Sequence, residues 1–398
     1  IALVKRILVG LILGAILGIA VPQATGIAIL GDVFVSALKA IAPLLVFFLV
    51  VSSLCNAGKS HGGVIKTVII LYMFSTVLAA VIAVFASMAF PVKMTLANAA
   101  TDTSAPQGIV EVLNNLLLNV VANPVSSLVN ANYVGILMWA VLLGLAFRAA
   151  DKMTKKVLAD VADGISMVVT WIINLAPFGI FGLVFNTVST NGLDIFTTYG
   201  KLLLLLVGCM LFIYFVTNPL LVYWCIRQNP YPLIFHCLKR SALTAFFTRS
   251  SAANIPVNMK VCEEMGLDRD TYSVTIPLGA TINMDGAAIT ITVMTMATAF
   301  TLGIHVDIPT AIILSLLAAL SACGASGVAG GSLLLIPMAC SLFGISDDIS
   351  MQVVAVGFII GVVQDSVETA LNSSSDLLLS ASAEFRQWRF EGKEIKFK

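Results

Sequence analysis

The sequence predicts an all-helical protein that crosses a membrane several times. Of its 398 residues, 59% are hydrophobic and 11% are charged, whereas a soluble domain has about 25% charged residues. Apolar runs long enough to span a bilayer alternate with short polar stretches along the chain. The net charge of +1 provides no basic face for a phosphate backbone, which argues against nucleic-acid binding as a main activity.

Six apolar runs before residue 230 are each expected to form a membrane-spanning helix. The second contains Pro43, which predicts a kink, and the fifth and sixth contain Pro177 and Pro219. Pro124 breaks the chain before the fourth run, and the polar residues 92–107 predict an exposed loop. The runs are residues 7–21, 34–55, 68–90, 134–147, 165–188 and 202–225.

The distribution of lysine and arginine predicts the orientation of these helices, because basic residues gather on the cytoplasmic side of a membrane. Nearly all lysines and arginines fall on one side of the membrane only if residues 230–268 leave the membrane on the face from which they entered. Both termini then lie in the cytoplasm, while Lys39, Lys93 and Lys201 lie on the opposite side.

Residues 230–268 are therefore expected to form a re-entrant helical hairpin. The runs 232–247 and 255–262 are each too short to cross about 30 Å of hydrocarbon. The polar stretch Thr248–Asn254 lies between them and is expected to form the tip of the hairpin.

A second hairpin is predicted nearer the C-terminus, entering from the opposite face. Its arms are residues 311–320 and 333–343, and its small-residue tip is 322–332. An Ile-Pro pair follows each tip, at Ile255-Pro256 and at Ile336-Pro337. Two similar units of opposite topology indicate an inverted repeat, which is typical of secondary transporters.

The stretch Thr281–Ala287 places polar residues in the middle of a predicted membrane helix. An ionised Asp285 at this depth costs several kcal/mol unless a partner satisfies it. Gly286 predicts an interruption that frees backbone carbonyls, which are tolerated only inside protein or beside a cavity and there commonly coordinate a cation. The alternative is a kink whose aspartate pairs with a neighbouring helix.

Polar side chains also recur at helical spacing in two other predicted spans. Those of the last span, residues 353–380, lie along one stripe that must face protein or water; the alternative is a solvated helix beyond the final span. Three hydroxyls in the span 68–90 share one helix face and could act together as ligands. The alternative is that each is satisfied by a hydrogen bond within its own helix. The stripe is Asp365, Glu368, Thr369, Asn372 and Asp376, and the hydroxyls belong to Tyr72, Ser75 and Thr76.

Three of these motifs together resemble those of a known family. Thr248-Arg249-Ser250-Ser251, Asn283-Met284-Asp285-Gly286 and the stripe are similar to motifs of the dicarboxylate/amino acid:cation symporters, which have the glutamate-transporter fold. The resemblance covers essentially the whole chain and is strongest to the bacterial branch that couples serine and threonine to sodium. It implies a homotrimer whose protomers have eight membrane helices and two opposed hairpins.

The resemblance also implies two domains that slide against each other in the elevator manner, in a bacterial inner membrane. Residues 1–63 and 92–193 would form the trimerisation scaffold. Residues 64–91 and 194–385 would form the mobile transport domain, and residues 386–398 a charged C-terminal tail.

One substrate site and three sodium sites are implied around the broken helix and the hairpin tips. Sodium is a hard cation that prefers oxygen ligands, which these residues supply. Asp365 would bind the substrate ammonium, and Asn372 with the backbone of Ser250, Ser251 and Val328 its carboxylate. One sodium ion would use Asp376, Asn283, Asn372 and Gly279, and another Asp285, Asn283, Tyr72, Ser75 and Thr76. The third would use carbonyls of Thr281, Ala322, Cys323 and Ala325, and sodium binding would order Asn283 and Met284.

Two departures from the acidic-substrate members of the family bear on the substrate. Glu368 stands where they carry an arginine, and Ala287 where they carry a threonine. Because like charges in a low dielectric repel by several kcal/mol, we expect a small neutral amino acid, preferably with a hydroxyl group. Glu368 is expected either to pair with Arg249 or to accept a hydrogen bond from the substrate hydroxyl, beside Thr369.

The resulting prediction is a sodium-coupled symporter of L-serine and L-threonine that is not an enzyme and has no organic cofactor. Gly324-Ala325-Ser326-Gly327 resembles the loop of rhomboid-type intramembrane serine proteases, but no histidine follows His305 to act as the base. The remaining alternatives are a passive channel, and a proton-coupled or other neutral or dicarboxylic amino acid symporter of the same fold.

Overall fold

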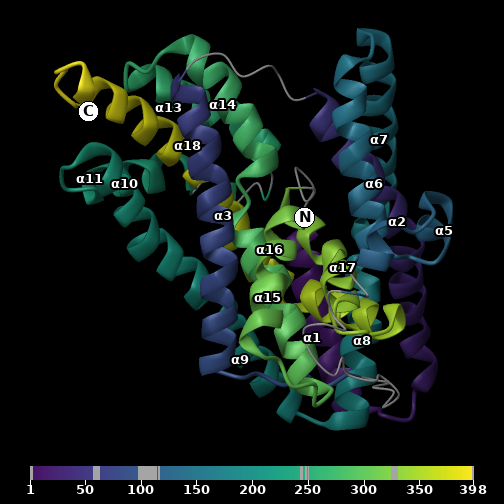
Figure 1. Cartoon of the computed structure of the whole chain (residues 1–398). Coiled ribbons are helices and arrows are strands. Elements are labelled where there is room, and N and C mark those ends of the chain that lie inside the picture. The colour runs from purple at the N-terminus through teal and green to yellow at the C-terminus, as the bar shows by residue number, and fades with distance from the viewer. Residues whose placement is uncertain are drawn as a thin grey trace.

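The computed structural model describes residues 3–56, 63–96, 114, 117–242, 245–246, 249, 251–323 and 330–396, and all regular secondary structure within them is helical. The predicted all-helical class is therefore confirmed (Figure 1). Among the described residues, three helical stretches are long and apolar enough to cross a membrane, namely Gly63–Ala89, Thr197–Ile226 and Asp347–Phe390.

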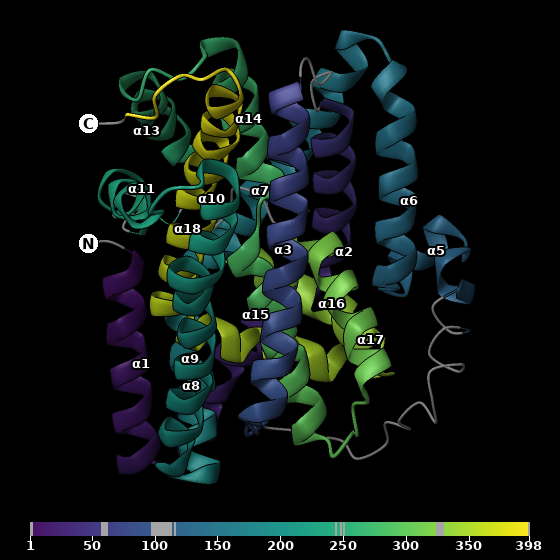
Figure 2. The same cartoon turned by 60° about the vertical axis from the view of Figure 1, so that its left-hand side comes forward.

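Helix α2 (Ala28–Asn56), which contains Pro43, is the centre of one group of helices. It contacts α6 (Tyr133–Ala146), α7 (Lys152–Asn174) and α8 (Ala176–Asn191). Helix α1 (Leu3–Ala20) lies along α8, as Figure 2 shows.

Two proline boundaries differ from the prediction. The fifth apolar run is divided at Leu175 between α7 and α8, because Pro177 cannot donate a backbone hydrogen bond and the chain tightens there, with Leu175 N bonded to Ile172 O. Pro124, expected only to break the chain, begins a short helix α5 (Pro124–Val129), which the side chain of Asn123 caps.

The second half is organised around α15 (Asp285–Thr301), which is buried from Asp285 to Ala299. It lies beside α3 (Gly63–Ala89), α16 (Ile308–Ala322) and α18 (Asp347–Phe390) (Figure 1). The sixth predicted span is continuous but carries a π-helical turn at Ile213–Thr217, just before Pro219, between α9 (Asp194–Phe212) and α10 (Asn218–Ile226).

Pairs of short helices occupy both places where a hairpin is predicted. The first pair is α11 (Tyr231–Cys237), continued by a π-helical turn to Ala242, and α13 (Ser251–Glu264). The second is α16 and the 3-10 turn Gly331–Leu335 with α17 (Ile336–Ser341). Residues 251–254, predicted to belong to the first tip, are instead the first turn of α13.

Candidate functional site

The predicted break in the helix lies at Asn283 and Met284. Helix α14 (Arg269–Ile282) ends before them and α15 begins at Asp285. Their backbone angles are not helical (φ −97°, ψ 88° and φ −126°, ψ 53°). Side chains of neighbouring helices accept hydrogen bonds from the freed amides. Met284 N donates to Thr76 Oγ1 at 3.3 Å, and Gly286 N donates to Asn372 Oδ1 at 2.7 Å.

Gly286 is required for a reason that the sequence pattern did not indicate. Its φ is not positive, but a Cβ atom there would lie 2.9 Å from Glu368 Cγ and 3.0 Å from Glu368 O. The residue therefore allows α15 to approach α18 closely, rather than causing the break.

Asp285 lies in a fully buried pocket of hydroxyl groups from α3. Ser75 Oγ donates to its Oδ2 at 2.6 Å, and Thr76 Oγ1 lies 3.3 Å from its Oδ1. In the described part of the chain, no lysine or arginine pairs with this carboxylate. A buried carboxylate with hydroxyl partners and no positive charge is a fitting ligand for a cation.

A second buried carboxylate, that of Asp376, lies on α18 beside the break. Asn283 Nδ2 donates to Asp376 Oδ1 at 2.9 Å and to Ser375 Oγ at 2.8 Å. Asn283 Oδ1 is buried and has no hydrogen-bond partner within the residues that the structure describes. An amide oxygen without a partner and a neighbouring carboxylate are two of the oxygen ligands that a hard cation prefers.

Tyr72 and Gly279 lie next to Asp376. The Tyr72 hydroxyl is 3.0 Å from Asp376 O and 2.9 Å from Ser380 Oγ, so it borders this pocket; the ion that it was predicted to share with Asp285 stays a prediction. A Cβ atom at Gly279 would lie 2.8 Å from both Asp376 Oδ1 and the Tyr72 hydroxyl.

On the other side of the break, Asp365 forms an ion pair with Arg249. Arg249 Nε donates to Asp365 Oδ2 at 2.7 Å, and Arg249 Nη2 lies 2.6 Å from the same oxygen. Gly330 N donates to Oδ1 at 3.2 Å. The predicted pairing of Arg249 with Glu368 is therefore wrong: Asp365, three residues earlier on α18, holds the guanidinium instead.

The buried carboxylate of Glu368 is held by three uncharged groups from three elements. Its Oε2 accepts from Thr290 Oγ1 at 2.7 Å, Ser332 Oγ at 2.9 Å and Gln364 Nε2 at 2.5 Å. None of the three donors was predicted from the sequence. The spacing of Gln364 and Glu368 by one helical turn could have indicated Gln364, whereas Thr290 and Ser332 reach Glu368 only through tertiary packing.

Of the remaining predicted residues, some lie within the described part of the chain and others lie outside it. Ala287 and Thr369 are buried, Thr281 Oγ1 donates to Leu278 O, and Ala322 is buried at the end of α16. Cys323 Sγ lies 3.9 Å from Ile282 O, so the end of α16 meets the break. Ser250, Ala325 and Val328 lie outside the described residues.

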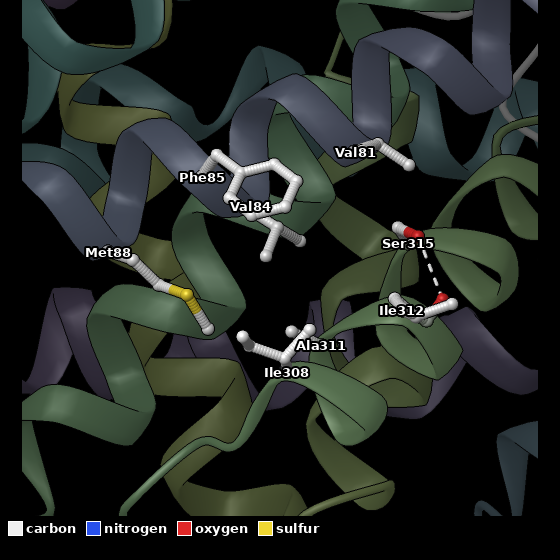
Figure 3. A pocket seen from close by; sticks show the side chains of 8 residues that line it. All are labelled: Val81, Val84, Phe85, Met88, Ile308, Ala311, Ile312 and Ser315. Atoms are coloured by element: carbon white, nitrogen blue, oxygen red, sulfur yellow. Dashed lines mark hydrogen bonds between the residues drawn. The ribbon is translucent and has the colours of Figure 1, made fainter.

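The gap between α3 and α16 is not a ligand site (Figure 3). It measures about 10 Å³ and is lined by apolar side chains such as Val84 and Ile308, while Ser315 Oγ donates to Ile312 O within its own helix. A buried water requires about this volume and two or more polar partners. The polar groups at the helix break therefore remain the candidate site.

Buried carboxylates and amides around a broken helix, in a chain of apolar helices, define a membrane protein of the secondary-transporter class. Residues 3–384 match the sodium:dicarboxylate symporter family, and the chain belongs to this family. The predicted family is thus confirmed.

Several relatives carry the same name, "Serine/threonine transporter SstT". That of Bifidobacterium adolescentis is 58% identical over 395 residues, covering 99% of this chain and 92% of the relative. That of Streptococcus thermophilus is 56% identical over 389 residues, covering 98% and 97%. That of Streptococcus agalactiae is 58% identical over 384 residues, covering 96% of each. Symporter membership and these relatives identify a transport protein rather than an enzyme.

Proposed function

We propose that this protein imports serine and threonine together with sodium ions. The observation that carries the proposal is the pair of buried carboxylates, Asp285 and Asp376, that flank the helix break without a basic partner in the described residues. The family description supports cation coupling, and the named relatives support the two substrates.

Reconstituted protein tests this function directly. In proteoliposomes, an inward sodium gradient should drive accumulation of labelled serine above its external concentration, and replacing sodium by choline should abolish it. Accumulation driven by a proton gradient in choline would indicate a proton-coupled symporter. Equilibration without accumulation would indicate a passive channel.

Two of the proposed sodium sites use the pockets of the break. One ion binds Asp285 with Ser75 and Thr76, and the other binds Asp376 with the free oxygen of Asn283. A third ion lies under the second hairpin, at the carbonyls of Thr281, Ala322, Cys323 and Ala325. Each ion would neutralise charge or dipoles that are costly at bilayer depth.

The proposed substrate site lies between Asp365 and the start of α13. The substrate ammonium takes the place of the Arg249 guanidinium on Asp365, since both groups are cationic donors. The substrate carboxylate binds Asn372 and the backbone amides of Ser250, Ser251 and Val328. Ser251 begins a 14-residue helix, and the free amides and positive dipole end of a helix N-terminus favour an anion.

The proposed architecture follows the family: eight membrane helices, two re-entrant hairpins and cytoplasmic termini in a bacterial inner membrane. Residues 1–63 and 92–193 form the trimeric scaffold. Residues 64–91 and 194–385 form the domain that moves as an elevator, leaving 386–398 as the tail. The short helices α11, α13, α16 and α17 support the hairpins.

Glu368 is proposed to recognise the substrate hydroxyl. Its three hydrogen bonds within the described residues all fall on Oε2, which leaves Oε1 as an acceptor. In Glu368→Gln, the ratio of serine to alanine affinity should fall about tenfold or more, because a hydrogen bond to a charged group contributes about 1.5–3 kcal/mol. Competition for serine binding measures the ratio, with the exposed Glu264→Gln as control. An unaltered ratio would rule out this role.

Gly279→Ala should weaken both folding and sodium binding. The added methyl group would lie 2.8 Å from the Asp376 carboxylate and the Tyr72 hydroxyl, and such overpacking costs about 1–3 kcal/mol. Thermal unfolding in detergent with and without sodium measures both effects. Gly164→Ala is the control, because a Cβ atom there meets nothing within 4 Å. Equal stabilisation of both variants by sodium would contradict the placement of an ion beside Gly279.

A further inference from the structure

A large apolar groove separates α3 from α9 on the outside of the molecule. Its volume is about 860 Å³, and it is lined by residues of the ranges 82–92 and 201–212. Among the described residues that line it, Lys201 alone is charged. The two helices are neighbours (Figure 2).

The groove is open to the surroundings along its apolar length. Leu204 is 75% exposed, Phe90 is 70% exposed and Phe85 is 53% exposed. Exposed apolar side chains are expected wherever a membrane helix faces lipid, so the distinguishing feature is the hollow of about 860 Å³ between the two helices. The substrate and sodium sites do not account for it, because none of their residues lines the groove.

The length of the groove matches one leaflet of a bilayer. Along α9 the lining extends from Lys201 to Phe212, and the eleven steps between these two residues rise about 16 Å at 1.5 Å per residue. One leaflet contributes about half of a hydrocarbon core that is about 30 Å thick. With Lys201 at the membrane surface, the apolar part therefore ends near the midplane.

The polar end of the groove is basic. Lys201 is exposed, and Lys93, also exposed, directly follows Val92, another lining residue. No carboxylate lines the groove in the described part of the chain. A ligand that fits has an anionic head at the two lysines and an apolar tail of one leaflet's depth, since lysine side chains reach from apolar surface toward a headgroup.

We propose that this groove binds one anionic phospholipid, with its phosphate at Lys201 and Lys93 and an acyl chain between α3 and α9. The lipid comes from the leaflet that faces Lys201. Because α3 also carries Ser75 and Thr76, the lipid contacts the helix that supplies hydroxyls to Asp285.

Native mass spectrometry of the detergent-purified protein tests the proposal. The protein is titrated with phosphatidylglycerol or with phosphatidylcholine of identical acyl chains, and the bound lipid is counted. Phosphatidylglycerol should bind more tightly. Lys201→Gln should weaken it about fivefold, the effect of one lysine near an anionic lipid surface. Lys66→Gln, an exposed lysine near the other end of α3, should leave it unchanged.

A matched pair of glycine variants tests the tail of the lipid. Gly208 lines the groove and Gly200 does not, yet a Cβ atom at either position meets nothing within 4 Å. Gly208→Leu should abolish retention of both lipids, whereas Gly200→Leu should retain them. Equal binding of the two lipids by the native protein, or equal behaviour of the two glycine variants, would overturn the proposal. A change of oligomeric mass in Gly208→Leu would do so too, because it would identify a second copy of the chain as the occupant.

Discussion

Asp365→Asn should lower serine uptake about 100-fold or more. The carboxylate is the proposed partner of the substrate ammonium, and it is 5% exposed. Removing one member of a buried ion pair costs about 3–5 kcal/mol, because the remaining charge is left uncompensated. The initial rate of sodium-driven uptake in proteoliposomes measures the loss. Asp348→Asn, at an exposed position in the first turn of the same helix, is the control.

Arg249→Gln distinguishes a substrate site from a permanent ion pair. If the ammonium replaces the guanidinium, removal of the arginine frees Asp365, so serine should bind as tightly as before or more tightly. If the pair only holds the first hairpin against α18, both variants should lose serine binding equally. Binding is measured by the thermal stabilisation that serine produces in the presence of sodium. Retained uptake by Asp365→Asn would contradict the assignment outright.

The features that the sequence predicted best are those whose free energy depends on local chemistry. A carboxylate in the middle of an apolar run is costly in any tertiary arrangement, so Asp285 and Asp376 indicate the candidate site from the sequence alone. Helical periodicity then placed the polar residues of α18 on one stripe. Ser75 and Thr76, three and four residues after Tyr72, both place their hydroxyls within hydrogen-bond distance of Asp285.

Pairings between distant segments were not predictable in the same way. Asp365 and Glu368 are three residues apart on one helix face, so the sequence could not decide which one meets Arg249. The choice depends on Thr290 and Ser332, whose hydroxyls already satisfy Glu368 from two other elements. Likewise, the role of Gly286 depends on how closely α18 approaches, which no local pattern records.

A predicted helix boundary was wrong where buried hydrogen bonds hold polar residues that the sequence pattern assigned to an exposed loop. Residues 251–254 begin and end with the polar Ser251 and Asn254 and were predicted to belong to a tip, but they form the first turn of α13, where Asn254 joins a buried hydrogen-bond network. Asn254 Nδ2 donates to Ser373 Oγ at 2.8 Å and to Ser241 Oγ at 3.0 Å, so the amide nitrogen of a polar side chain in this turn finds its partners inside the protein. Polarity indicates exposure only when no buried partner exists.

Asp285→Asn should raise the sodium concentration for half-maximal serine uptake about 100-fold. A carboxylate and a monovalent cation about 4 Å apart attract by about 4 kcal/mol at an effective dielectric constant of about 20, and the amide retains only part of this attraction. Asparagine keeps the shape of the side chain and can still pair with Ser75 and Thr76, so folding should be preserved. Uptake at graded sodium concentrations measures the change, with the exposed Asp163→Asn as control.

Ser75→Ala separates the charge of Asp285 from its hydrogen bonds. The variant removes the 2.6 Å bond to Oδ2 but keeps the carboxylate, so the sodium dependence should shift by about tenfold, as expected for a hydrogen bond to a charged group. If Asp285 were a structural residue satisfied by α3 alone, Asp285→Asn and Ser75→Ala would lower thermal stability and leave the sodium dependence unchanged. Because substrate and sodium binding are coupled reciprocally, a sodium site at Asp285 also requires that saturating serine lower the sodium concentration needed by both variants.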